Sequence, residues 1–277
     1  MTKRSYMNIA FIGGGNMATA LIAGLINEGG ASTEVHVVDR NPEALKRLAA
    51  QYGATTAGAI DAAVADADVI VLAVKPQQMR EVATALAPYL TGGQLVLSIA
   101  AGIRGADLSR WLGGYGAIVR AMPNTPALIG MGITGLVALK GVSDAQRTAA
   151  DSVLRAVGQT VWLDDEALID PVTAVSGSGP AYVFYFLEAM QAAAVEMGLS
   201  AEQGKQLALA TFAGATELAA QSDESLEVLR QRVTSKGGTT HAAITSMESS
   251  GVKESIVAAM KAASARGREL GDELGAT

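Results

Sequence analysis

Asn8-Ile9-Ala10-Phe11-Ile12-Gly13-Gly14-Gly15-Asn16-Met17-Ala18 is the stretch of sequence that decides the fold. Its apolar run from Ile9 to Ile12 is typical of a central strand of a parallel sheet. The next residues match the pattern G-x-G-x-x-A, in which glycines permit a tight turn and leave room for a pyrophosphate. Helix-spaced apolar residues then continue to Ile26. The stretch therefore predicts a strand, a phosphate-binding turn and a helix, in preference to an ordinary strand–helix turn.

A second strand, 35–39, ends in a carboxylate. Asp39 lies 24 residues past Gly15, in the region where an acidic side chain commonly binds the ribose hydroxyls of adenosine. Arg40 follows directly, and a guanidinium suits a 2′-phosphate. This pair is compatible with both nicotinamide dinucleotides, and a solvated turn residue is the other interpretation of Arg40. We interpret Arg40 as a phosphate-binding residue, which predicts NADPH as the preferred cofactor and NADH as the alternative.

Strands and helices alternate through the first half of the chain, which predicts an α/β fold with a doubly wound parallel sheet. Strands are expected at 54–56, 68–74, 94–100, 117–121, 132–139 and 160–163. Ligands of such sheets bind beyond the carboxyl ends of the strands. The residues expected at those ends, besides the glycine turn, Asp39 and Arg40, are Ala73, Val74, Lys75, Pro76, Ala100, Ala101, Gly102 and Asn124. Each segment alone could be a loop, but together they predict one binding edge.

The pattern changes near residue 163, after which helices are expected at 166–175, 180–197, 200–221, 223–234, 239–249 and 252–274. We therefore predict a dinucleotide-binding domain at 1–163 and a helical domain at 164–277. The second domain carries more apolar surface than so short a segment can enclose. Part of that surface is expected to contact a second copy of the chain.

Composition excludes several classes of function. With 27 acidic and 21 basic residues among 277, the net charge of −6 argues against binding to nucleic acid or an anionic membrane. The chain has no cysteine, and its histidines are His36 and His241, so no thiol nucleophile and no metal site are predicted. It has no uninterrupted apolar run of about 20 residues, and glycines break the apolar stretch after Lys3 and Arg4. We expect a cytoplasmic protein without a signal peptide.

A second motif, Thr234-Ser235-Lys236-Gly237-Gly238-Thr239-Thr240-His241, interrupts the helical half. Two glycines free the backbone just before a helix begins, and hydroxyl groups stand on both sides of them. One interpretation is a cradle in which helix-start amides and hydroxyls bind a small carboxylate. The other is a glycine turn in which a threonine caps the helix. The residues alone leave both open.

Five motifs occur in an order that resembles the pyrroline-5-carboxylate reductase family over nearly the whole chain. They are Ile12-Gly13-Gly14-Gly15-Asn16-Met17, Ala73-Val74-Lys75-Pro76, Met122-Pro123-Asn124-Thr125-Pro126, Ser176-Gly177-Ser178-Gly179-Pro180-Ala181-Tyr182 and Thr234-Ser235-Lys236-Gly237-Gly238-Thr239-Thr240. The resemblance implies a Rossmann domain, an all-helical dimerisation domain, and reduction of 1-pyrroline-5-carboxylate to L-proline with NADPH or NADH, the last step of proline biosynthesis. It also implies a homodimer, which in this family can assemble further into a decamer of five dimers.

The resemblance also assigns site residues. Cofactor contacts are expected at Ile12, Gly13, Gly14, Gly15, Asn16, Met17, Asp39, Arg40, Ala73, Val74, Lys75, Pro76, Ala100, Ala101 and Gly102. Substrate contacts are expected at Ser235, Gly238, Thr239 and Thr240, with Thr240 as the catalytic candidate that hydrogen-bonds the ring nitrogen. Many family members carry an asparagine near the adenine ribose where this chain has Ile60.

Two alternatives remain. A β-hydroxyacid dehydrogenase shares the plan of a Rossmann domain followed by helices, but it needs a lysine on the long helix, and 181–197 contains none. A nucleotide-binding protein without turnover would keep the Gly13 turn but would not need the loop from Ser235 to Thr240.

Overall fold

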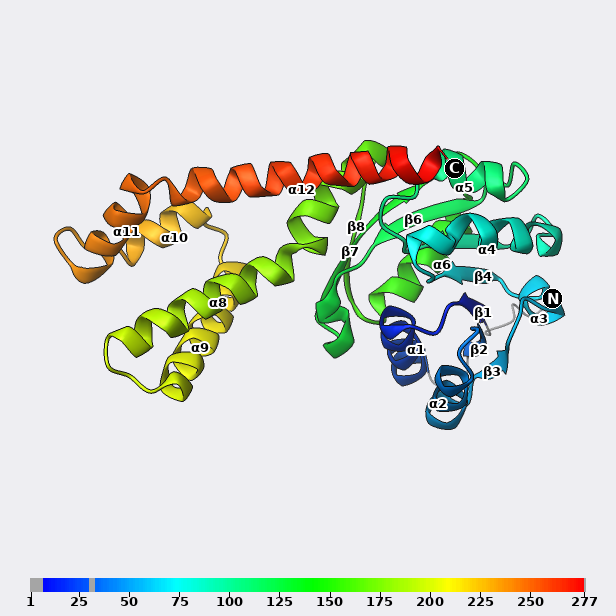
Figure 1. The fold of residues 1–277 in the computed structure, drawn as a ribbon, viewed down its shortest axis with the longest axis horizontal. Coiled ribbons are helices and arrows are strands. Elements are labelled where there is room, and N and C mark those ends of the chain that lie inside the picture. The colour runs from blue at the N-terminus through cyan, green and yellow to red at the C-terminus, as the bar shows by residue number, and fades with distance from the viewer. Residues whose placement is uncertain (1–6, 30–32, 277) are drawn as a thin grey trace. The chain divides into compact units, whose positions relative to one another are not determined.

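The computed structural model describes residues 7–29 and 33–276, so Lys3 and Arg4 lie outside the described residues. The chain divides into two compact units (Figure 1). The first contains the described residues of 1–178 and 262–277, and the second contains residues 179–261. These units are defined by packing, and the functional boundary at residue 163 stays a prediction.

The first unit is built on an eight-stranded sheet with the order β3-β2-β1-β4-β5-β6-β7-β8. Its strands are β1 (Met7–Ile12), β2 (Thr33–Val38), β3 (Thr55–Ala57), β4 (Val69–Leu72), β5 (Leu95–Ser98), β6 (Ile118–Met122), β7 (Gly132–Ala138) and β8 (Gly158–Trp162). The first strand pairs in parallel with β2 on one side and β4 on the other. From β1, the sheet therefore continues through β2 and β3 on one side and through β4 to β8 on the other. This reversal of strand order marks the place where dinucleotides bind in Rossmann folds.

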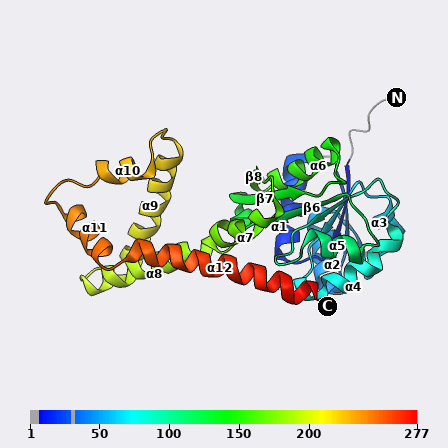
Figure 2. The same cartoon turned by 90° about the horizontal axis from the view of Figure 1, so that it is seen from above.

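Helices cover both faces of the sheet. They are α1 (Asn16–Gly29), α2 (Pro42–Tyr52), α3 (Ala62–Ala65), α4 (Met79–Leu86), α5 (Gly105–Trp111), α6 (Asp144–Arg155) and α7 (Ile169–Val172). Figure 2 shows α1 and α6 on one side of the sheet and α3, α4 and α5 on the other. Capping side chains begin two of them, with Asn41 accepting from the first amides of α2 and Ser143 forming a capping box with Gln146.

Successive residues of each central strand enter different cores. Phe11 and Val71 pack in the layer that holds α1, α2 and α6, whereas Ile12 and Leu72 pack in the layer that holds α3, α4 and α5. All four are buried, and full burial of such a side chain contributes about 1.5–3 kcal/mol. This two-sided burial explains why the central strands are continuous apolar runs without alternation.

One part of the sheet differs from the parallel arrangement that the sequence predicted. β7 runs antiparallel to β6, although β8 again runs parallel to β7. The connection from β6 to β7 holds only the short helical segment Thr125–Ile129. A parallel crossover needs about a dozen or more residues, so this shorter segment returns the chain in the opposite direction.

The second unit contains α8 (Gly179–Glu196), α9 (Ala201–Ala220), α10 (Leu226–Arg232), α11 (Thr239–Ser249) and the first part of α12 (Val252–Gly275). A π-helical segment, Thr173–Gly177, precedes α8 where an ordinary helix was expected at 166–175. Within this unit α8 packs on α9, where the rings of Phe186 and Phe212 are 6.5 Å apart.

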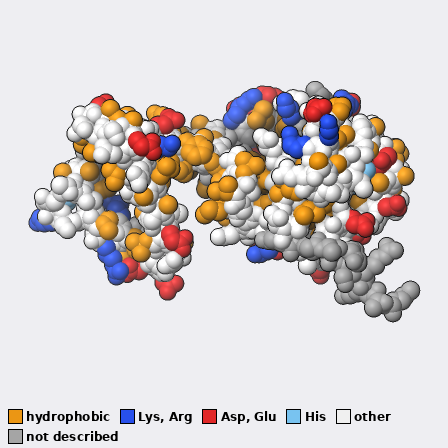
Figure 3. All heavy atoms as spheres, turned by 90° about the horizontal axis from the view of Figure 1, so that it is seen from below, with side chains coloured by type: hydrophobic (Ala, Val, Ile, Leu, Met, Phe, Trp, Pro, Cys, Tyr) orange, Lys and Arg blue, Asp and Glu red, His pale blue; other side chains and the backbone are white. Residues whose placement is uncertain are grey.

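Large apolar side chains remain exposed on these helices, including Tyr185, Leu226 and Phe184. Hydrophobic side chains are accordingly spread over this unit in Figure 3. Among the described residues, no helix combines the length and the apolar character required to cross a membrane.

Candidate functional site

The glycine turn after β1 is closed by contacts that only glycine allows. Gly13 has a φ of 105°, and a Cβ at this position would lie 2.6 Å from the carbonyl oxygen of Ala73. The Gly13 amide donates to the carbonyl oxygen of Val38 at 2.8 Å, and the Ala73 amide donates to that of Ile12 at 2.8 Å. These bonds draw the ends of β1, β2 and β4 together.

In contrast to Gly13, Gly15 is not required by the packing of the protein itself. A Cβ at Gly15 would have no heavy atom within 4 Å, and the residue is exposed at the start of α1. The open space next to helix-start amides therefore fits a ligand phosphate that approaches the backbone closely.

Asp39 joins two turns at this edge. One carboxylate oxygen accepts from the Gly14 amide at 2.6 Å, and the other accepts from the Asn41 amide at 2.8 Å. The carboxylate therefore fixes both the glycine turn and the start of α2. Each oxygen keeps a second lone pair, so Asp39 can also accept hydrogen bonds from ribose hydroxyls.

A cavity of about 330 Å³ lies beside the turn, between the ends of β1 and β2 and the helix α4. Five predicted cofactor residues line it, namely Ile12, Gly13, Asp39, Arg40 and Val74. Its other lining residues include Gly58, Ala59, Ile60, Gln78, Glu81, Val82, Ala85 and Tyr89. The Ile60 carbonyl accepts from the Tyr89 hydroxyl at 3.2 Å, which holds the loop after β3. The cavity thus has the position and the mixed lining expected for the adenosine end of a dinucleotide.

Sequence reasoning missed the residues that α4 contributes to this cavity. Glu81, Val82 and Ala85 lie on α4, and Gln78 lies directly before it. Members of this set that are three or four positions apart, such as Glu81 and Ala85, share one helical face. That helical spacing was the signal that could have found them.

The remaining predicted cofactor residues continue along the same edge of the sheet and do not line this cavity. Gly102, after β5, has a φ of 70°, and a Cβ there would lie 3.2 Å from that of Leu270. Arg104 forms an ion pair with Asp272, and this hydrogen-bonded contact raises the pKa of Arg104 above its usual value. The last turns of α12 therefore support the 100–102 loop.

Asn124 follows β6 and is buried. Its side-chain oxygen accepts from the amide of Ile133 at 3.0 Å, which ties the end of β6 to the beginning of β7. Lys75 is exposed immediately before Pro76, which begins a short helical turn ahead of α4. Both residues lie at the carboxyl edge, as predicted.

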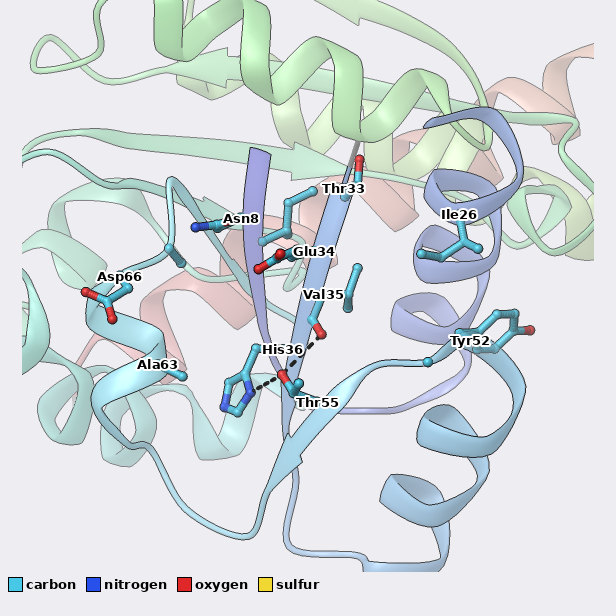
Figure 4. Close-up of a pocket in the computed structure, with 13 residues that line it drawn as sticks. Asn8, Ile26, Thr33, Glu34, Val35, His36, Tyr52, Thr55, Ala63 and Asp66 are labelled. Carbon is cyan, nitrogen blue, oxygen red and sulfur yellow. Dashed lines mark hydrogen bonds between the residues drawn. The ribbon is translucent and has the colours of Figure 1, made fainter. Parts of the chain in front are cut away.

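A wider cavity of about 570 Å³ lies at the opposite edge (Figure 4). Asn8, Thr33 and Glu34 line it, so it lies near the beginning of β1 and β2. His36 also faces it, with Nδ1 hydrogen-bonded to the Thr55 hydroxyl at 2.8 Å and Nε2 3.2 Å from an Asp61 oxygen. Ligands of Rossmann folds bind at the carboxyl edge, so we do not assign the cofactor to this cavity.

The predicted substrate loop lies in the helical unit and leads into α11. Gly237 has a φ of 77°, and the Gly238 amide donates to the Ser235 carbonyl oxygen at 3.0 Å. Gly238 occupies the N-cap position, and no side chain caps the helix. The interpretation of this turn as a threonine-capped helix start is therefore wrong. Ser235, Thr239 and Thr240 are exposed around helix-start amides that lack a side-chain acceptor, which suits an anion.

Comparisons with known proteins agree with this architecture. Residues 166–270 match a sequence model described as pyrroline-5-carboxylate reductase dimerisation, and residues 8–102 match one described as NADP oxidoreductase coenzyme F420-dependent. The chain is 48% identical to the pyrroline-5-carboxylate reductase of Pseudomonas aeruginosa over 96% of this chain and 98% of that protein.

Solved structures of similar proteins extend these matches to the fold. A pyrroline-5-carboxylate reductase from Coxiella burnetii has a TM-score of 0.89 and 41% identity, covering 95% of this chain and 98% of that chain. The pyrroline carboxylate reductase of Plasmodium falciparum, solved with NADP bound, has a TM-score of 0.85 and 29% identity, covering 96% and 98%.

Proposed function

Because this chain belongs to the pyrroline-5-carboxylate reductase family and reduces 1-pyrroline-5-carboxylate to L-proline with NAD(P)H, we propose which of its residues perform that reaction. The observation that carries the proposal is the uncapped start of α11, which follows two glycines and is surrounded by hydroxyls. Family membership decides against the β-hydroxyacid dehydrogenase and against a nucleotide-binding protein without turnover. Oxidation of NADPH by the purified chain with 1-pyrroline-5-carboxylate tests the function directly.

We assign the cofactor to the carboxyl edge of the sheet. The residues fit it, because the space at Gly15 admits a pyrophosphate and the cavity beside Asp39 and Arg40 admits adenosine. The cofactor contacts expected at 12–17, at 73–76, at 100–102 and at Asn124 lie at or just after the carboxyl ends of β1, β4, β5 and β6. When bound, NAD(P)H supplies the hydride for the reaction.

We assign the substrate to the loop before α11. The amides of Gly238, Thr239 and Thr240, together with the Ser235 hydroxyl, hold the substrate carboxylate, and the Thr240 hydroxyl orients the imine nitrogen. A protonated imine is already a strong electrophile, so the chain needs neither a nucleophile nor a metal ion. The new C–H bond forms at the imine carbon while nitrogen keeps the electron pair of the former double bond. Positioning of this kind can contribute about 7–11 kcal/mol.

The predicted preference for NADPH depends on Arg40. Arg40→Ala should remove a charge-assisted contact to the 2′-phosphate, which corresponds to about 1.5–3 kcal/mol or roughly ten- to a hundredfold in NADPH affinity. NADH lacks this phosphate, so its affinity should change little. Dissociation constants for both cofactors measure the effect, and equal losses would show that Arg40 does not bind the phosphate.

The chain forms a homo-oligomer, as its match to a dimerisation domain shows. We propose that the chain forms an obligate dimer through residues 164–277 and that five dimers can build a decamer. We also propose that the enzyme acts in the cytoplasm. The exposed apolar side chains of the helical unit support the dimer. Sedimentation at low micromolar concentration should show dimers or larger assemblies, and a stable, active monomer of 28.2 kDa would contradict the proposal.

A further inference from the structure

The cation proposed to bind the 2′-phosphate already has a partner in the structure. The guanidinium of Arg40 forms an ion pair with the carboxylate of Glu81, and both residues line the cavity beside the glycine turn. Their side chains are 71% and 63% exposed, respectively. Exposed ion pairs of this kind contribute little net free energy, so Arg40 can exchange this partner for another anion.

The ion pair spans the end of the central strand. Arg40 follows β2 in the chain, Glu81 lies on the helix that follows β4, and β1 lies between those two strands. The pair therefore joins the two sides of the cavity above the turn that begins at Gly13. A dinucleotide whose adenosine enters this cavity must encounter both members of the pair.

The charges of the lining disfavour a phosphate. Arg40 is the cationic side chain among the lining residues, and Asp39 and Glu81 are the two carboxylates. A 2′-phosphate carries a charge of about −1.5 to −2 at pH 7. At Arg40 it would meet a guanidinium whose charge Glu81 partly neutralises, and it would also be repelled by the Glu81 carboxylate.

We propose that Glu81 is a specificity-determining residue that holds Arg40 in competition with the 2′-phosphate and thereby limits the preference for NADPH. With NADH, Arg40 keeps Glu81 as its partner, and Asp39 accepts from the ribose hydroxyls. With NADPH, the phosphate must displace Glu81 from Arg40. This inference rests on the phosphate role proposed for Arg40.

The test uses the purified full-length enzyme and four forms: wild type, Glu81→Gln, Arg40→Ala and the double variant. Dissociation constants for NADPH and NADH are measured by quenching of nicotinamide fluorescence at low and high salt. Glu81→Gln should tighten NADPH binding by about three- to tenfold at low salt and less at high salt, while NADH changes by less than about twofold. Glu43→Gln is the matched control, since it removes an exposed carboxylate of α2 that does not line the cavity.

The outcomes separate this inference from the proposal on which it rests. If the NADPH gain of Glu81→Gln is lost or much reduced in the Arg40→Ala background, competition for Arg40 is supported. If Arg40→Ala weakens NADPH but Glu81→Gln leaves the ratio of the two dissociation constants unchanged, Arg40 keeps its role and the inference about Glu81 fails. If the gain persists fully without Arg40, or if Arg40→Ala affects neither cofactor, competition for Arg40 is contradicted.

Discussion

Replacement of Gly15 by valine should nearly abolish NAD(P)H binding while leaving the folded protein intact. The side chain would occupy the open space in which we place the pyrophosphate. Each charge-assisted hydrogen bond between phosphate and backbone contributes about 1.5–3 kcal/mol, so losing two raises the dissociation constant on the order of 100-fold or more. The free energy of unfolding should fall by no more than about 1 kcal/mol, because only the N-cap preference of α1 changes.

Gly13→Val is the contrasting variant for this experiment. Its Cβ would collide with the Ala73 carbonyl, and its φ of 105° is strained for any residue with a side chain. This variant should lose at least about 2 kcal/mol of stability as well as cofactor binding. Calorimetric titration and thermal unfolding of both variants decide the matter. If Gly15→Val bound NADPH as tightly as the wild type, the pyrophosphate could not lie at this turn.

Removal of a hydroxyl from the substrate loop should lower kcat/KM for 1-pyrroline-5-carboxylate roughly ten- to a hundredfold. Thr240→Ala and Ser235→Ala each remove one hydrogen bond to the substrate, which corresponds to about 1–3 kcal/mol of transition-state stabilisation. No hydroxyl from this loop caps α11, so removal of the Thr240 or Ser235 hydroxyl should not destabilise the helix. Cofactor affinity should remain close to that of the wild type, because the cofactor residues lie in a different part of the chain.

Thr245→Ala serves as the matched control, since it removes an exposed hydroxyl from the middle of the same helix. It should leave kcat/KM unchanged. Wild-type kcat/KM in both Thr240→Ala and Ser235→Ala would place the substrate site elsewhere. A loss that appeared equally in NADPH binding would show that the loop acts through the fold and not through the substrate.

Much of the fold could be predicted because local chemistry agrees with tertiary structure. The run from Ile9 to Ile12 is buried on both faces, and Asn41 and Ser143, residue types that commonly cap helices, cap α2 and α6. The direction of β7 was not predictable from its own residues, since it depends on how short the preceding connection is. No local sequence pattern indicated the π-helical segment at Thr173–Gly177, a conformation that is rare in proteins.

The turns of the candidate site were predictable where backbone conformation restricts the residue type. Gly13 and Gly237 have positive φ values, and glycine is the residue that adopts them without strain. The ion pair between Arg40 and Glu81 was not predicted, because an exposed glutamate on a helix carries no local signal. The two residues are far apart in the sequence, and the strand order of the sheet brings them together.

The most direct test of the central claim is the stoichiometry of turnover. Purified enzyme is mixed with NADPH and 1-pyrroline-5-carboxylate, the absorbance of the reduced nicotinamide is followed, and L-proline is quantified in the same sample. Our account predicts that NADPH is oxidised only when the imine is present, with one L-proline formed for each NADPH consumed. If the fully folded protein bound NADPH but formed no L-proline from 1-pyrroline-5-carboxylate, the account would be contradicted.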